Sequence, residues 1–201
     1  MKIAVVSLAL ASCLLTSCYM RTPKQESWTN PEFKNRSIGK TLVMGNADSQ
    51  SLRHQYEALF VQHLLPYVSA GPYHESIDIK GKIERDQLEK LLQENDIQTV
   101  IVTTLMDGDQ KSETIVTGYD ATPYDSGYWG YYDWGYTLSA NTATVSSYME
   151  FSLETNVYDV ESKKLIWTGR KRIFDDRSDT DNMNLIILDV IHDLKKQGML
   201  N

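Results

Sequence analysis

The chain has 201 residues, enough for one ordinary domain. It is 41% hydrophobic and 23% charged, as globular proteins are and disordered or collagen-like chains are not. A formal net charge of −7 argues against a protein that binds nucleic acid through a basic surface. Both cysteines lie within the first 18 residues, so the rest of the chain has neither a disulfide nor a thiolate metal site.

The first residues predict a secretion signal, at 1–17. Lys2 supplies a short basic region, and residues 3–15 are almost wholly apolar. This stretch is too short to cross a bilayer, which takes about 20 residues. The sequence LTSC at positions 15–18 resembles the lipobox of bacterial lipoproteins. The resemblance implies cleavage before Cys18 and its attachment to lipid, palmitate included.

The sequence leaves two alternatives to lipidation at Cys18 open. The sequence LASC at positions 10–13 matches the lipobox equally well, but it leaves a very short apolar region. An ordinary signal peptide with two incidental cysteines is the other. Tyr19 follows Cys18, where an aspartate would favour retention at the inner membrane. The sequence therefore predicts a lipid anchor in the outer membrane and a chain facing the periplasm, because two or more acyl chains attach a protein stably.

The mature chain begins with a polar stretch, residues 18–39, that predicts a tether between lipid and domain. A short apolar run predicts a buried strand over 40–45. Asp48 or Ser49 then caps a predicted helix over about 50–67, whose apolar residues recur on one stripe. Residues 73–79 predict a second, weakly apolar strand.

The second half of the chain has clearer patterns. A helix is predicted over 86–95, and residues 99–105, apolar on both faces, predict a central strand. Alternating residues predict an antiparallel hairpin over 147–158 and 164–174. A last helix, capped by Asp179 or Thr180, ends at Gly198.

This order of elements, β-α-β-α-β-β-β-α, predicts an α/β fold in which a single mixed β-sheet has helices packed on it. The domain is expected to span residues 40–198. It contains an insertion rich in tyrosine and glycine at about 109–145.

The chain also resembles uncharacterised bacterial envelope lipoproteins. Their domain is like the amino-terminal domain of the Tol-system translocation protein and the curli-secretion lipoprotein. The resemblance rests on RHQYE at 53–57, residues 99–107, LETNVYD at 153–159 and KLIWTG at 164–169. It spans about residues 40–198 and implies the same α/β fold. It brings no established activity and no catalytic residues, and the membrane-spanning hairpins of the secretion channel are not found here.

An aromatic segment within the insertion is the candidate binding loop. Its rings are interleaved with glycines, which break helices and weaken strands, so they are not all expected in the core. Exposed rings at this density often mark a contact surface. The alternative is a disordered insertion, or one folded back over the sheet edge. The candidate binding residues are Tyr124, Tyr128, Trp129, Tyr131, Tyr132, Trp134 and Tyr136.

Other candidate sites are weak. Arg53 and Glu57 are four residues apart, which predicts a surface ion pair. The four histidines lack ligand spacing, and the acidic stretch 175–181 lacks the glycine and glutamate of a calcium loop. We therefore expect no metal and no cofactor. No motif of nucleophilic or phosphate-binding catalysis occurs, so the chain is not expected to be an enzyme.

These observations together predict a non-catalytic binding or scaffolding module of the cell envelope. Its expected contacts are the membrane, through lipid on Cys18, and an envelope protein. A glycan, either peptidoglycan or another polysaccharide, held by the aromatic loop is the alternative. No nucleic acid is expected as a partner.

Overall fold

The computed structural model describes residues 26–47, 49–76, 83–106, 127–141, 150–174 and 178–201. Its strands are β1 (Glu26–Thr29), β2 (Thr41–Asn46), β3 (Ala70–Pro72), β4 (Thr99–Met106), β5 (Glu150–Asp159) and β6 (Leu165–Phe174). Its helices are the short 3-10 helix η1 (Pro31–Phe33), α1 (Gln50–Leu64), α2 (Tyr73–Ser76), α3 (Arg85–Glu94), α4 (Gly127–Asn141) and α5 (Asp179–Lys196).

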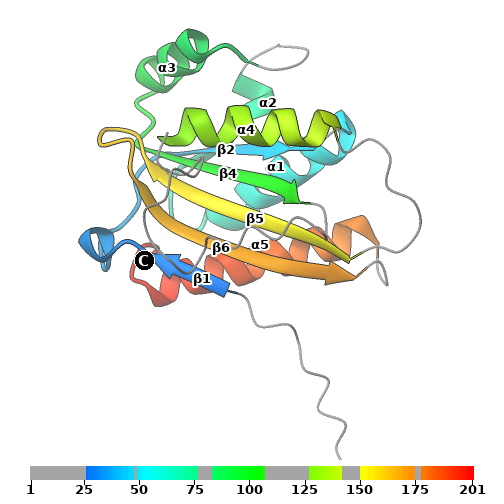
Figure 1. The fold of residues 1–201 in the computed structure, drawn as a ribbon. Helices are drawn as coiled ribbons and strands as arrows, with labels where there is room; N and C mark the ends of the chain where they lie inside the picture. The colour runs from blue at the N-terminus through cyan, green and yellow to red at the C-terminus, as the bar shows by residue number, and fades with distance from the viewer. Residues whose placement is uncertain (1–25, 48, 77–82, 107–126, 142–149, 175–177) are drawn as a thin grey trace, which may run out of the picture.

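The strands form one mixed sheet in the order β1-β6-β5-β4-β2-β3, with helices packed on it, as predicted (Figure 1). Strand β2 is parallel to β3 and β4, and the remaining pairs are antiparallel. Strand β4, apolar on both faces, lies inside the sheet, as its composition predicts.

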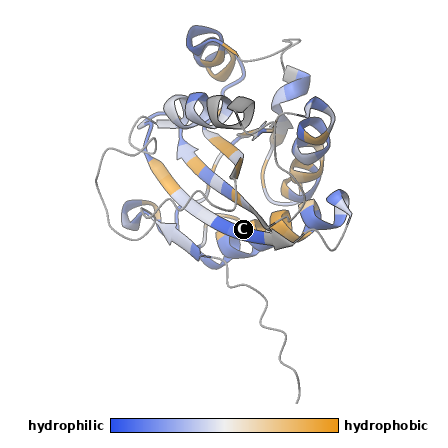
Figure 2. Cartoon of the chain, turned by 45° about the vertical axis from the view of Figure 1, so that its right-hand side comes forward, coloured by the Kyte–Doolittle hydropathy of each residue, from blue (hydrophilic) through white to orange (hydrophobic). Residues whose placement is uncertain are grey.

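The sheet separates two apolar cores. Helices α1 and α5 cover one face, over a cross-strand row formed by Val43, Ile101, Val157 and Trp167. Helices α3 and α4 contribute to the core on the other face, which includes Leu42. Figure 2 shows that hydrophobic residues lie along the strands and on parts of the helices. Because side chains alternate between the two faces of the sheet along a strand, β2 and β4 contribute residues to both cores.

Local sequence signals set the ends of α1 and α5, the two helices that cover one face of the sheet. Ser49 caps α1 by accepting a hydrogen bond from the Leu52 amide, and Ser178 caps α5 by accepting one from the Asp181 amide. The cap of α5 therefore lies one residue before the predicted Asp179. Gly198 follows α5 with a φ of 71°, the left-handed conformation that commonly ends helices.

The described fold begins before residue 40. Strand β1 pairs with β6, and the buried Phe33 and Ile38 join the core beside α5. Residues 26–39, predicted as tether, are thus part of the domain. The predicted strand over 73–79 is wrong, because residues 70–72 form β3 and residues 73–76 form α2. Among the described helices, none has the length and apolarity to cross a membrane.

Candidate functional site

The aromatic segment of the insertion is helix α4 rather than a loop. The side chains of Tyr128, Tyr131 and Tyr132 recur at helical spacing and are buried in the core shared with α3. Trp129, Trp134 and Tyr136 are partly buried and pack against the same core. Tyr124 lies outside the described residues. The prediction of an exposed recognition loop is therefore wrong for the buried tyrosines.

Two contacts explain how a segment so rich in glycine becomes helical. The Tyr131 hydroxyl donates to the buried carboxylate of Glu154, at 2.9 Å. Gly135 lies against β2 and β4, where an added Cβ would be only 2.5 Å from Asn46 Nδ2 and Thr104 Oγ1. Glycine here allows the helix to approach the sheet closely. Tertiary packing thus overrides the low intrinsic helix propensity of the segment.

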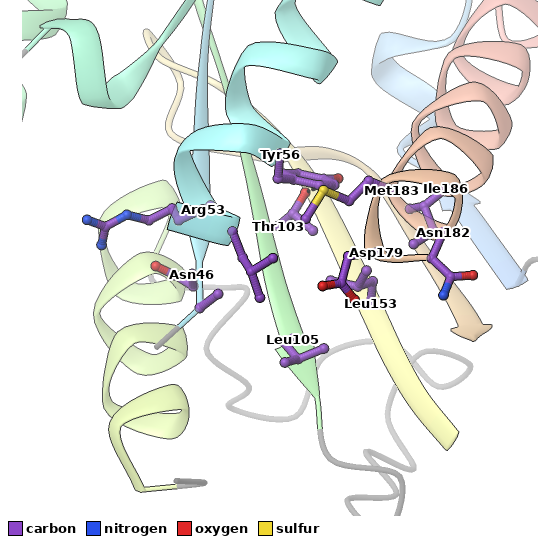
Figure 3. Close-up of a pocket in the computed structure, with 13 residues that line it drawn as sticks. Asn46, Arg53, Tyr56, Thr103, Leu105, Leu153, Asp179, Asn182, Met183 and Ile186 are labelled. Atoms are coloured by element: carbon purple, nitrogen blue, oxygen red, sulfur yellow. Dashed lines mark hydrogen bonds between the residues drawn. The ribbon is translucent and has the colours of Figure 1, made fainter. Parts of the chain in front are cut away.

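A half-open cavity of about 180 Å³ lies between the first turns of α1 and α5, over the carboxyl ends of β2 and β4 (Figure 3). We call it the α1–α5 cavity. Its walls are mainly apolar. They are formed by Gly45, Asn46, Ala47, Leu52, Arg53, Tyr56, Thr103, Leu105, Leu153, Asp179, Asn182, Met183 and Ile186. Ligands commonly bind α/β sheets at the carboxyl ends of parallel strands.

Neutral hydroxyl groups lie under the cavity. The Tyr56 hydroxyl is 3.0 Å from Thr103 Oγ1, which is in turn 3.0 Å from Thr155 Oγ1. Burial raises the pKa of Tyr56 to about 12, despite hydrogen bonds from the two threonines that lower it. The hydroxyl therefore stays protonated at neutral pH and does not act as a base.

Arg53 contributes to the wall, but its charge is directed elsewhere. Figure 3 shows its guanidinium turned away from Asp179 and Met183 on α5. Its Nε is buried and has no hydrogen-bond partner among the described residues, as is also true of Asn46 Oδ1. Figure 3 also shows the Asp179 carboxylate beside Leu153, so the apolar side chains share the cavity wall with an acidic group.

Glu57 is a buried carboxylate that joins three elements beside the cavity. Its Oε1 accepts the Gly45 amide of β2 at 2.9 Å, and its Oε2 accepts the His74 amide of α2 at 2.9 Å. The His74 ring Nδ1 lies 2.7 Å from the same Oε2, which places the imidazole proton on Nδ1. The predicted surface ion pair with Arg53 is wrong, because both side chains are buried and Glu57 pairs with His74.

His54 stacks on the ring of His74, with ring centroids 4.3 Å apart. Burial lowers the pKa of His54 below its ordinary value, and the charges of His74 and Arg53 lower it further, against an opposing effect of Glu57. At this position the folded chain therefore binds protons less readily than the unfolded chain. The stability that follows is complete above the ordinary pKa and is lost as pH falls through the folded-state pKa.

We therefore expect His54→Gln to weaken the dependence of stability on pH. The free energy of unfolding in urea, measured from about pH 8 to pH 5, should fall less for His54→Gln than for the unsubstituted chain. His192→Gln, at an exposed position of α5, is the matched control and should keep the original slope. Equal slopes for all three proteins would contradict the assignment to His54.

No described group of three or more His, Cys, Asp or Glu residues is placed to hold a metal ion. The structure thus brings together side chains that sequence analysis did not connect: Leu52, Leu105, Leu153, Met183 and Ile186 around the cavity, and Glu57 with Gly45 and His74 beside it. The apolar stripes of α1 and α5 were recognisable from the sequence. Their meeting point was not, because it depends on contacts between distant segments.

No family model and no curated protein matches the chain. Among solved structures it is similar to a PelC dodecamer from Paraburkholderia phytofirmans, with 9% identity and a TM-score of 0.45 over 88% of this chain and 97% of that one. A PelC variant from the same organism gives 11% identity and 0.46 over 84% and 94%. Lipoprotein GNA1162 from Neisseria meningitidis gives 14% and 0.36 over 78% and 96%. These scores are too low to carry an argument about function.

Proposed function

We propose that this protein is an outer-membrane lipoprotein facing the periplasm, held by lipid on Cys18, whose domain is a non-catalytic binding module. The α1–α5 cavity carries the proposal. It is half-open, and rigid elements of the sheet and of two helices build it. Its walls supply apolar contacts, and the Tyr56 hydroxyl beneath it stays protonated. Such a site suits binding of an apolar group better than acid–base chemistry.

Burial of the aromatic rings bears on the choice between the two candidate partners, an envelope protein and a glycan. Glycan stacking needs open ring faces, and three of the seven rings on which it was predicted, Tyr128, Tyr131 and Tyr132, are buried. An envelope partner that places an apolar group into the α1–α5 cavity is better supported. The resemblance to the Tol-system and curli-secretion domains stays a prediction.

Photo-crosslinking in cells tests this function. A photoreactive residue at Leu52, half-buried in the cavity wall, should give a discrete adduct. The same group at Ala58, an exposed position of α1, is the matched control and should give none. Equal yields at both positions would contradict binding at the cavity.

The same cells test the anchor. Labelling with an alkyne analogue of palmitate should be lost in Cys18→Ser and retained in Cys13→Ser. The Leu52 adduct should then disappear in Cys18→Ser alone, because the domain no longer reaches its place in the envelope. Label retained in Cys18→Ser and lost in Cys13→Ser would move the anchor to the alternative lipobox.

A further inference from the structure

The walls of the α1–α5 cavity are suited to an alkyl chain. Five large aliphatic or thioether side chains line it, and the one aromatic ring in its wall, Tyr56, presents a neutral group. The polar part of the wall is smaller and consists of Asn46, Arg53, Thr103, Asp179 and Asn182. An apolar cavity of about 150 Å³ stays free of water and accepts benzene. At about 180 Å³ this cavity has room for roughly six carbon atoms. The five side chains are Leu52, Leu105, Leu153, Met183 and Ile186.

The register of the sheet places the cavity at the end where the chain enters the fold. Glu26, the first residue of β1, is opposite Arg170, which is opposite Glu154 on β5. The same row continues through Thr104 to Asn46, a residue of the cavity wall. Since strands lie about 4.8 Å apart, the backbone at Leu153 is roughly 10 Å from that at Glu26.

The chain between the anchor and the domain is short. Seven residues separate Cys18 from Glu26, and an extended chain of this length spans at most roughly 28 Å. A lipid on Cys18 therefore keeps the cavity end of the domain close to the membrane surface. Amphiphiles that leave the bilayer are most concentrated there.

We propose that the α1–α5 cavity binds the end of the alkyl chain of a single-chain amphiphile, a fatty acid or a lysolipid. This inference rests on the proposed function and gives its ligand a chemical class. A double-chain lipid already has its tails in hydrocarbon and gains little by moving into the cavity. A single chain that is partly in water gains the full free energy of burial.

Calorimetric titration of the mature chain carrying Cys18→Ser tests the inference without the protein's own lipid. The probes are 1-alkanols of four to ten carbons. Because burial of each methylene group contributes about 0.8 kcal/mol, the dissociation constant should fall about four-fold for each added carbon. The gain should level off near six carbons, when the cavity is full.

Variants that fill the cavity separate this site from adsorption elsewhere. Met183→Phe and Leu52→Trp, two independent changes at half-buried wall positions, should each weaken hexanol binding at least ten-fold. Leu188→Trp, at an exposed position on α5, is the control and should leave hexanol affinity unchanged. Circular dichroism identifies any variant that fails to fold. Absence of alkanol binding, or binding that both folded filling variants retain, would overturn the proposal.

Two further comparisons distinguish the sources of the chain. Tighter binding of decanoate than of decylphosphocholine indicates a free fatty acid, and the reverse order indicates a lysolipid.

The lipidated protein in lipid nanodiscs should bind the same alkanols. If it does not, the protein's own acyl chain fills the cavity, which overturns a free amphiphile as the ligand. A Leu52 adduct in cells together with no alkanol binding would leave the proposed function standing and reject this ligand class.

Discussion

Glu57→Ala is expected to lower the free energy of unfolding by about 2–4 kcal/mol, because a fully buried carboxylate that accepts three hydrogen bonds is lost. The carboxylate accepts the amides of Gly45 and His74 and pairs with the His74 ring. Its removal leaves the buried Gly45 amide and the partly buried His74 amide without this acceptor, and an unsatisfied buried donor costs about 1–3 kcal/mol. The contacts between α1, α2 and β2 should loosen together.

Urea unfolding monitored by circular dichroism measures this effect. Glu75→Ala is the matched control, because Glu75 is the next residue after His74. Its side chain is 71% exposed, and its carboxylate is as far as 3.9 Å from the His74 ring Nε2. It should change the free energy of unfolding by less than about 0.5 kcal/mol. If both variants lose the same amount, the three hydrogen bonds of Glu57 are not a structural clamp.

Tyr131→Ala is expected to cost about 3–5 kcal/mol, as truncation of a fully buried aromatic ring does. The ring is 0% exposed, and its hydroxyl donates to Glu154, which Arg170 also contacts. Tyr131→Phe keeps the ring and removes only the hydroxyl, so it should cost about 1 kcal/mol. The difference between the two variants measures how firmly α4 is packed.

Tyr136→Ala is the control within the same helix, since this ring is only partly buried. It should cost less than half as much as Tyr131→Ala in the same urea titration. Should Tyr131→Ala leave stability unchanged, α4 would not be part of the core, and the aromatic segment would return as a candidate recognition surface.

The strands and long helices are predictable because their signals are local. Residues 99–105 are apolar on both faces, and the hairpin alternates, so β4, β5 and β6 follow from composition and period. The stripe of α1 and its cap, Ser49, are also visible in the sequence. These elements fix the fold class.

The elements that sequence analysis missed depend on partners far along the chain. Strand β1 is polar at Glu26 and Ser27 and forms only because β6 offers it a free edge. Helix α4 has poor helix formers, and only burial of its tyrosines makes it helical. Glu57 has the spacing of a surface pair, but the short β3 leaves Gly45 unpaired on one side, where the carboxylate takes its place.

The candidate site was the least predictable part for the same reason. Leu52, Leu153 and Met183 come from α1, β5 and α5, and no pattern within any one segment signals that they meet. The aromatic segment, by contrast, has a distinctive composition, but its many rings serve packing in the core. Density of rings alone does not distinguish a contact surface from a core.

The close approach of α4 to the sheet also sets an order of assembly. Gly130 and Gly135, inside the helix, each cost it about 1 kcal/mol relative to alanine, so α4 is not stable apart from the surface that receives it. The strands beneath must pair before the helix forms. A chain whose sheet has formed before α4 docks would leave this aromatic core open to water. Such a species is the one most exposed to aggregation and to proteolysis.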